Sequence, residues 1–407
     1  MLTAGIAALM IMSAAVAEAA SDETGAIEAT ATDTLTGAPI SKFCAQAFGG
    51  IGRGGCTENG VLTLSDLPPG EYSTLVDSDP DYFDDDVRVR VTSNQTATVA
   101  ARLAPTAKIA VTVVDANTKA PVQDACVHAK TGIGSFHDLV QSCTGPDGTL
   151  TITNLTTGAY NLWVQPRDTV HGAQWVGTNG GTGSRLLAKT VNAVAGKTVT
   201  VPPILLDGAG SISGTVVDST TNAPVAAVCA FPRAGRSYDG AHGHRPNCTK
   251  QDGRYTMSGL GPYHWPVNFI DNVGSYGWQW SGDQPSQLTA TTVKVHVGQT
   301  ATSDAHLSEG STVTGKVVSN GVDGDLRVFN AITGDAASDY TFADADGNYT
   351  LKNVAGNQLV KVAYTDLEKP PYNQYWYRDA TTFGSARPIP VRAGTPVTGI
   401  DFAIQPR

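Results

Sequence analysis

The chain is poor in charged residues and in methionine, and it has no cluster of basic residues. Charged side chains make up 16% of its 407 residues, only 4 residues are Met, and the formal net charge is −10. An acidic chain without a basic cluster is repelled by phosphate backbones and anionic lipid, so a neutral or cationic partner is favoured over nucleic acid. No stretch repeats apolar residues every 3.6 positions between capping signals, which predicts almost no helix after the N-terminus.

Long apolar runs are also missing, with the exception of Leu2 to Ala17, which is shorter than the ~20 residues of a membrane-spanning helix. Ala17-Glu18-Ala19 offers a small-x-small cleavage site, so we expect residues 1–19 to be a signal peptide. The basic start of such peptides is absent, because the first basic residue is Lys42, and an uncleaved anchor is the alternative reading. The segment predicts export, with no membrane insertion after cleavage.

No cysteine is left over, because the six cysteines form three pairs at matching places in a repeated local pattern. In each copy the second cysteine opens Cys-Thr and leads to Asn-Gly or Asp-Gly. The pairs are Cys44 with Cys56, Cys126 with Cys143, and Cys229 with Cys248. Without a Cys-x-x-Cys knuckle for zinc or an odd cysteine for catalysis, we expect three disulfides and an oxidising compartment. A fourth copy has Phe329 and Phe342 where the cysteines belong, which predicts a packed aromatic pair.

Glycine, proline, threonine and valine are plentiful and favour strands and turns. Alternating segments at 27–33, 109–115, 212–218 and 313–319 each open a module, and Asx-Gly pairs mark hairpins at Gly60, Gly148, Gly253 and Gly347. Apolar residues alternate again after each turn, as in a sheet that packs on another sheet. We therefore predict an all-β fold, a tandem array of four Ig-like or transthyretin-like β-sandwich domains at residues 22–104, 105–207, 208–308 and 309–407. Links of only a few residues predict a semi-rigid rod.

The third copy carries a resemblance to a known family. Its run Gly214-Thr215-Val216-Val217-Asp218, Ala223-Pro224-Val225, Asp252-Gly253-Arg254-Tyr255 and Leu260 resembles the carboxypeptidase regulatory-like domain. That group is similar to transthyretin-like and collagen-adhesin B-type repeats and is near the starch-binding-like sandwiches. The resemblance covers nearly all of the mature chain in four copies; it implies the sandwich fold and is nearly silent on function. In-module disulfides are not general in that family, and no recurring Lys, Asn and acid set supports an isopeptide staple.

One aromatic position recurs outside the opening strands. Trp175, Trp280 and Trp376 each lie about twenty residues before a closing-strand glycine, and Trp278 and Tyr377 flank two of them. Exposed rings at these places would stack on sugar faces and form a repeated carbohydrate-binding site. Buried rings would instead plug the loop onto the sandwich edge or onto the next module.

Two clusters contain residue types that bind metals. His242 and His244 lie in a loop that no other module repeats, so a solvated loop is favoured over a metal site. Six Asp between positions 77 and 86 could hold Ca²⁺, but their spacing matches no EF-hand loop and a solvated loop is again favoured. No cofactor is predicted.

Catalysis has little support in the sequence. No Gly-x-Ser-x-Gly occurs, and four sandwiches leave no room for a peptidase domain or an amylase barrel. We predict a secreted or cell-surface protein, not an enzyme, that acts as structural spacer, adhesin or matrix-binding module, with an extracellular polysaccharide or a matrix or surface protein as partner. The alternative is a carbohydrate-binding, starch-binding-like accessory array of an extracellular glycan-degrading system, and a glycoside hydrolase is a more distant one.

Overall fold

The computed structural model describes residues 23–131, 141–232, 247–271, 274–318, 323–367 and 374–404. These residues are strands, turns and loops, with a single 3-10 turn, η1 (Arg185–Leu187). No helix among them is long and apolar enough to cross a membrane. The predicted signal peptide, residues 1–19, lies outside the described residues. The chain divides into two compact units, the first ending at Pro105 and the second beginning at Thr106.

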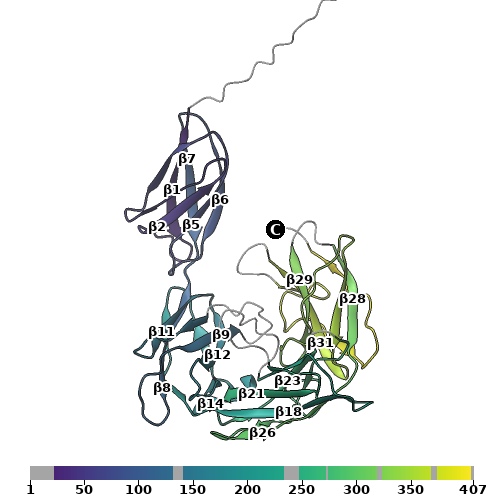
Figure 1. The fold of residues 1–407 in the computed structure, drawn as a ribbon. Helices are drawn as coiled ribbons and strands as arrows, with labels where there is room; N and C mark the ends of the chain where they lie inside the picture. The colour runs from purple at the N-terminus through teal and green to yellow at the C-terminus, as the bar shows by residue number, and fades with distance from the viewer. Residues whose placement is uncertain are drawn as a thin grey trace, which may run out of the picture. The chain divides into compact units, whose positions relative to one another are not determined.

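The first unit is a β-sandwich of two sheets (Figure 1). One sheet has the order β4 (Leu62–Leu67), β1 (Gly25–Asp33), β7 (Thr96–Leu103), and β1 pairs antiparallel with β4 and parallel with β7. The other has the order β3 (Arg53–Thr57), β2 (Phe43–Phe48), β5 (Gly70–Asp77), β6 (Asp85–Val91). Ile27, Phe43, Tyr72 and Val99 are among the buried residues between the sheets. This core follows from the period-two pattern, because alternate side chains of a strand point to one face.

The second unit repeats this plan in three successive ranges, each with an opening strand that pairs antiparallel on one side and parallel on the other. The three sheets that contain the opening strands are β8 (Ala107–Asp115) with β11 (Thr149–Leu155), β16 (Thr198–Thr200) and β17 (Ile204–Leu206); β18 (Gly210–Asp218) with β21 (Arg254–Leu260), β26 (Thr300–Thr302) and β27 (Ala305–Leu307); and β28 (Ser311–Val318) with β30 (Asn348–Val354) and β34 (Phe402–Ala403).

A second sheet completes each range. In the first range this sheet has the order β10 (Gln141–Cys143), β9 (Ala125–Thr131), β12 (Gly158–Pro166), β13 (Gln174–Gly177), β14 (Gly180–Thr182), and β15 (Thr190–Ala193) also pairs with β12. In the second range the order is β20 (Asn247–Cys248), β19 (Val228–Phe231), β23 (Asn268–Asp271), β24 (Gln279–Trp280). In the third range the order is β29 (Gly324–Asn330), β31 (Gln358–Asp366), β32 (Gln374–Trp376), and β33 (Ile389–Val391) also pairs with β31. A separate pair joins β22 (His264–Trp265) to β25 (Val293–Lys294). The all-β sandwich prediction is confirmed.

The predicted opening strands are also confirmed, whereas the predicted hairpins at the Asx-Gly pairs are wrong. In the first three copies the strands on either side of the pair lie in different sheets, as β3 pairs with β2 while β4 pairs with β1, so the turn carries the chain from one sheet to the other. β1, β8 and β18 end at Asp33, Asp115 and Asp218, as their alternation predicts. The Asx-Gly glycines all have positive φ, at +82° for Gly60, +71° for Gly148, +71° for Gly253 and +81° for Gly347. The residue before each glycine keeps negative φ, so each turn ends in one left-handed glycine rather than containing two left-handed residues.

The modules of the second unit do not contact only their neighbours in sequence. Nη2 of Arg185, in η1, donates to Asp335 Oδ1 at 2.8 Å and to the Thr333 carbonyl at 2.7 Å. Arg185 belongs to the second predicted module and Asp335 to the fourth. The expectation of a semi-rigid rod is therefore wrong for this unit, because its second and fourth modules are in contact.

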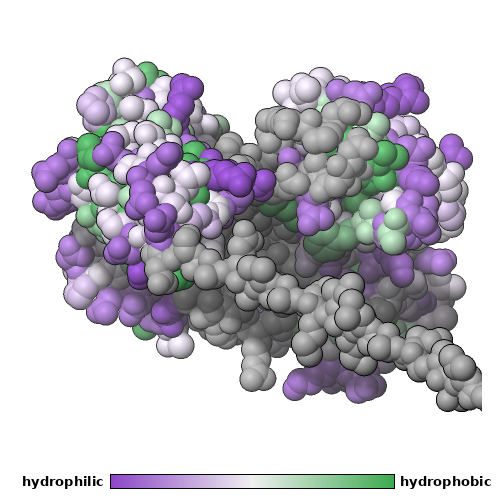
Figure 2. Space-filling model, turned by 90° about the horizontal axis from the view of Figure 1, so that it is seen from above, coloured by the Kyte–Doolittle hydropathy of each residue, from purple (hydrophilic) through white to green (hydrophobic). Residues whose placement is uncertain are grey.

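Hydrophilic residues cover most of the described surface in Figure 2, with smaller hydrophobic areas between them. Single exposed apolar residues are ordinary on protein surfaces and mark no site by themselves.

Candidate functional site

Each predicted cysteine pair is joined by a disulfide between directly opposed residues of neighbouring strands. Cys44–Cys56 joins β2 to β3, Cys126–Cys143 joins β9 to β10, and Cys229–Cys248 joins β19 to β20. The Cα atoms of the three pairs are 4.0, 3.9 and 3.8 Å apart. No free cysteine occurs within the described ranges. The disulfide prediction is confirmed.

The aromatic pair predicted for the fourth copy is wrong. In β9 and β12, Cys126 faces Gln165, two residues after Trp163, the residue that faces Trp175. In β29 and β31, Asp325 faces Thr365, two residues after Ala363, the residue that faces Trp376. Asp325 therefore takes the place of the first cysteine, because the connection into β29 is shorter than the one into β9. Phe329 instead packs on Trp376 and Phe342 on Tyr340, with ring centroids 5.3 and 5.6 Å apart.

The repeated tryptophans lie at equivalent places, and all of them are buried. Trp175 faces Trp163, Trp280 faces Asn268, and Trp376 faces Ala363, each across a hairpin of the second sheet. The exposed fractions are 1% for Trp175, 3% for Trp280, 2% for Trp376 and 4% for Trp278.

A buried ring presents no face to a sugar, so the hypothesis that these tryptophans form stacking platforms is not supported by this arrangement. Tyr377 is half-buried and packs on Phe402, with ring centroids 6.3 Å apart. Trp175 contacts Trp163 at 5.2 Å, and Trp163 contacts Trp265 of the next sandwich at 5.9 Å. The rings close the edge of their own sandwich, and in the second copy they also close the boundary with the third.

At the candidate residues that the structure describes, the side chains are not arranged to bind a metal ion. His242 and His244 lie outside the described residues. In the acidic segment, Asp85 accepts a hydrogen bond from the Arg102 backbone N–H at 3.0 Å, and Asp86 accepts one from the Ser73 hydroxyl. Over the ranges that the structure describes, no group of three or more His, Cys, Asp or Glu side chains is arranged to hold a metal ion.

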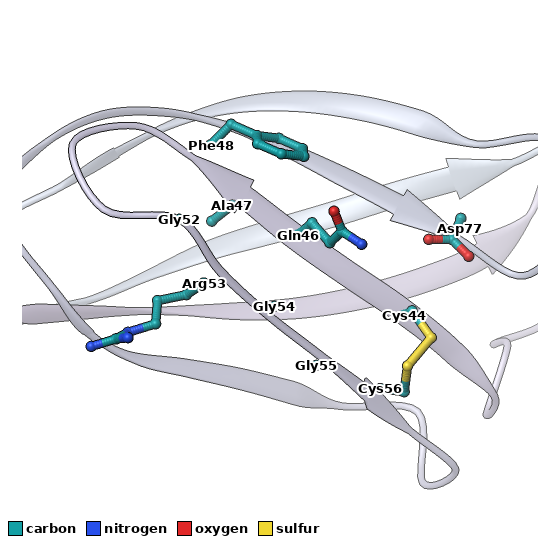
Figure 3. Close-up of a pocket in the computed structure, with 10 residues that line it drawn as sticks. All are labelled: Cys44, Gln46, Ala47, Phe48, Gly52, Arg53, Gly54, Gly55, Cys56 and Asp77. Carbon is teal, nitrogen blue, oxygen red and sulfur yellow. A yellow bond between two sulfur atoms is a disulfide. The ribbon is translucent and has the colours of Figure 1, made fainter.

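The first unit has an open groove that the sequence did not single out (Figure 3). It measures about 500 Å³ and is lined by Cys44, Gln46, Ala47, Phe48, Gly52, Arg53, Gly54, Gly55, Cys56 and Asp77. Figure 3 shows Gln46 between Phe48 and Asp77; Gln46 and Phe48 belong to β2 and Asp77 to β5. Gly54 and Gly55 on β3 carry no side chains, which leaves the groove open along this strand.

The corresponding face of the second unit is covered. Consecutive residues of β9, β12, β29 and β31 are buried on both faces of their sheets. In β2 burial alternates instead: Ala45 and Ala47 are buried, Gln46 is exposed, and Phe48 is 52% exposed. In the first unit the place of β13 is taken by β6, which pairs with β5 and contains no tryptophan. The missing tryptophan of the first copy is the sequence signal that could have predicted this open face.

Three side chains of the groove offer contacts to a ligand, while the side chain of Arg53 points away from them in Figure 3. Phe48 provides a flat apolar surface, the Gln46 amide both donates and accepts hydrogen bonds, and the Asp77 carboxylate accepts them. Burial raises the pKa of Asp77, and the nearby carboxylates of Asp79 and Asp84 raise it further, against a backbone hydrogen bond from Asp79 that lowers it. A few polar groups beside an apolar surface are typical of a site for a neutral polar ligand.

No family model and no curated protein matches the chain. Among solved structures it is similar to the Bacillus anthracis TIE protein, at 9% identity over 90% of this chain and 69% of that one, with a TM-score of 0.20. A streptococcal ancillary pilin matches at 12% identity over 69% of this chain and 98% of that one, with a TM-score of 0.22. The shaft pilin spaA from Lactobacillus rhamnosus GG matches at 11% identity over 46% of this chain and 97% of that one, with a TM-score of 0.26. Likenesses at these TM-scores carry no argument about what this chain does.

Proposed function

We propose that this protein is an exported, non-catalytic structural or adhesive protein of the cell surface or extracellular space. The observation that carries the proposal is the set of three disulfides, each inside one repeated sandwich. Structural disulfides persist in oxidising compartments, and bridges at the same place in successive sandwiches stabilise each copy separately. Repeated sandwiches with internal disulfides suit a protein that binds surfaces or keeps them apart.

The compartment and the bridges are tested together. Cells that make the protein are fractionated, and the protein is mapped by mass spectrometry of its peptides without reduction. We expect it in the medium or surface fraction, with the three described pairs joined. Recovery from the cytoplasm with alkylatable thiols would overturn the proposal. The non-catalytic part would fail if the purified chain turned over a labelled polysaccharide or peptide substrate.

A second candidate function, saccharide binding, is favoured by the groove of the first unit rather than by the buried tryptophans. Its test is a glycan array probed with the full chain, followed by titration of the best glycan. We expect Phe48→Ala to weaken binding by about tenfold or more, because stacking on an aromatic ring and the area it buries contribute more than ~1 kcal/mol. Phe342→Ala is the matched control, since Phe342 is 56% exposed and lies in the fourth copy. Binding that survives Phe48→Ala, or binding of polypeptides alone, would contradict saccharide recognition at this groove.

A further inference from the structure

Three links between sandwiches share one polar contact that recurs in the chain. Asp33, Asp115 and Asp218, at the ends of the first three opening strands, each use Oδ1 to accept two backbone N–H groups of the following turn. The second carboxylate oxygen contacts a ring group. Asp33 Oδ2 accepts from the Tyr82 hydroxyl at 3.0 Å, and Asp218 Oδ2 accepts from the Tyr276 hydroxyl at 2.9 Å. Asp115 Oδ2 lies 3.0 Å from Nε2 of His171.

These three ring residues also hold the end of their sandwich. Tyr82, His171 and Tyr276 form isolated β-bridges with Pro105, Gly208 and Glu309, the residues that lead out of each sandwich. The next backbone N–H in each copy bonds the residue before the bridge. Phe83 N–H donates to Ala104 at 2.8 Å, Gly172 N–H to Asp207 at 2.9 Å, and Gly277 N–H to Ser308 at 3.0 Å. The carboxylate–ring contact therefore fixes the start of each link.

The second link differs in its ring chemistry. Nδ1 of His171 lies 2.8 Å from Asp168 Oδ2, while Nε2 contacts Asp115. An ionised carboxylate only accepts hydrogen bonds, so both contacts are hydrogen bonds only when both ring nitrogens carry protons. Neutral imidazole has one N–H and must leave one carboxylate facing a lone pair. A tyrosine hydroxyl at the other two links keeps its proton throughout the physiological range.

The charges around the ring favour the protonated form. Burial lowers the pKa of His171, but the hydrogen bonds to Asp168 and Asp115 outweigh it, and the net shift is upward. The pKa of Asp115 is held well below its usual range by the Thr118 backbone and hydroxyl, with His171 adding to the effect. Burial raises the pKa of Asp168, yet hydrogen bonds from His171 and Val170 lower it more. The Asp207 carboxylate, on the other side of the link, accepts a hydrogen bond from the Tyr263 hydroxyl at 2.6 Å rather than from His171.

His171 precedes the segment that joins the second sandwich to the third. Ala173 N–H donates to Gly259 at 2.8 Å, and Gly261 N–H donates to Ala173 at 3.0 Å. A side chain on Gly172 would lie 2.3 Å from the Gly261 nitrogen, so the two backbones are in close contact there. Release of the link at His171 would therefore act directly on the boundary between these sandwiches.

We propose that His171 is a protonation-controlled clamp on the link between the second and third sandwiches, tight when the imidazole is protonated and looser when it is neutral. The links at Tyr82 and Tyr276 have the same backbone contacts without this control.

The direction of the pH dependence follows from the upward shift of the His171 pKa. A group whose pKa is higher in the folded state stabilises that state fully below its unfolded value of about 6.5. The stabilisation is lost as the pH rises through the raised value. The clamp is therefore closed in mildly acidic medium and opens towards mildly alkaline medium.

The test is hydrogen exchange of the full chain at about pH 5.5 and 8.5, corrected for intrinsic exchange rates. We expect protection at Gly172 and at Ala209, whose N–H donates to the Val170 carbonyl at 2.8 Å, to fall severalfold at the higher pH, with little change at Phe83 and Gly277. Titration of the His171 ring by NMR should give a midpoint above 6.5, the unperturbed value.

Two variants and one control separate the clamp from a merely structural role. His171→Tyr installs the residue of the other two links and should remove the pH dependence while the link stays protected. Asp168→Asn removes one carboxylate and should move the transition to lower pH. His306→Gln, at an exposed histidine beside Asp283, should leave the profile unchanged. An equal pH response at all three links, a response that persists in His171→Tyr, or a ring that titrates at or below its unperturbed value would overturn the proposal.

Discussion

The sandwiches of this chain are of two kinds, which differ in whether a tryptophan lies at one hairpin position of the second sheet. In the second unit Trp175, Trp280 and Trp376 occupy the same hairpin position and are buried, while the first unit has no tryptophan there. A large ring at this place covers the outward face of the second sheet. Its absence in the first unit leaves Phe48 and Gln46 exposed.

Trp175→Ala should destabilise the second unit strongly. The ring is 1% exposed and packs on Trp163, so its loss removes apolar burial and leaves a cavity. We expect the free energy of unfolding to fall by about 3–5 kcal/mol in a urea titration. Leu288→Ala, at a 56% exposed side chain of the same unit, is the control and should change it by less than about 0.5 kcal/mol. Similar small effects from both substitutions would show that Trp175 is not a packing residue.

Gly214 in β18 is a second residue that packing restricts. An added Cβ would lie 1.8 Å from the Ser303 carbonyl oxygen, the oxygen that accepts the Tyr255 hydroxyl at 2.7 Å. Gly214→Ala should therefore lower the free energy of unfolding by about 1–3 kcal/mol, the usual range for overpacking. Gly50→Ala is the control, because an added Cβ there meets nothing within 4 Å. Thermal unfolding measures both, and equal midpoints would contradict the close approach.

At the level of strands and turns, local sequence signals predicted the strands and the places of the turns, but not that the Asx-Gly turns lead from one sheet to the other. The alternation of 27–33 and 109–115 and the positive φ of Gly60 and Gly148 are local properties, so one copy of the chain is enough to read them. Cysteines at matching places predicted the bridges for the same reason.

What covers a face is not a local property. The alternation of a strand shows which side chains point outward, but not whether a hairpin or the next sandwich covers them. The sequence therefore leaves both an exposed and a buried Trp175 open. Phe329 was misplaced because a shortened connection shifted the register by several residues. The groove at Phe48 was missed because it results from what the first copy lacks, and the His171 link because it joins residues far apart in sequence.

Reduction should act on some hairpins and spare others. Each disulfide closes a loop of 12, 17 or 19 residues across one hairpin. In the loop-entropy model each bridge of this size stabilises its sandwich by about 3 kcal/mol. We expect hydrogen exchange with a phosphine reductant to speed up in β2, β9 and β19 and to stay unchanged in β29. An equal acceleration in β29, which has no bridge, would mean that the stapling is not local to each copy.

For the molecule as a whole, one ion pair joins sandwiches that are not neighbours in sequence. Arg185 and Asp335 are both largely buried, and the guanidinium donates to Asp335 from Nε at 3.1 Å as well as from Nη2. Removing one partner of a buried pair leaves the other charge without compensation, whereas replacing both with apolar residues is often neutral. The pair therefore makes the stability of the fourth sandwich depend on the second.

Arg185→Ala should lower the free energy of unfolding of the second unit by about 3 kcal/mol. The double substitution Arg185→Met with Asp335→Leu should recover most of that loss, since no buried charge is left unpaired. Denaturant titration of both variants and of the parent chain gives the comparison. A double variant as unstable as the single one would show that the charges themselves, rather than their pairing, are required.

The three staples also differ in how far a reductant can reach them. At the first cysteine position Cys44 is half-buried, whereas Cys126 and Cys229 are 2% and 0% exposed. At the second position Cys56 is exposed, whereas Cys143 and Cys248 are half-buried. Thiol–disulfide exchange begins with attack on an accessible sulfur. A mildly reducing medium would therefore reduce the Cys44–Cys56 disulfide first, and the sandwich of the first unit would lose stability before the sandwiches of the second unit do.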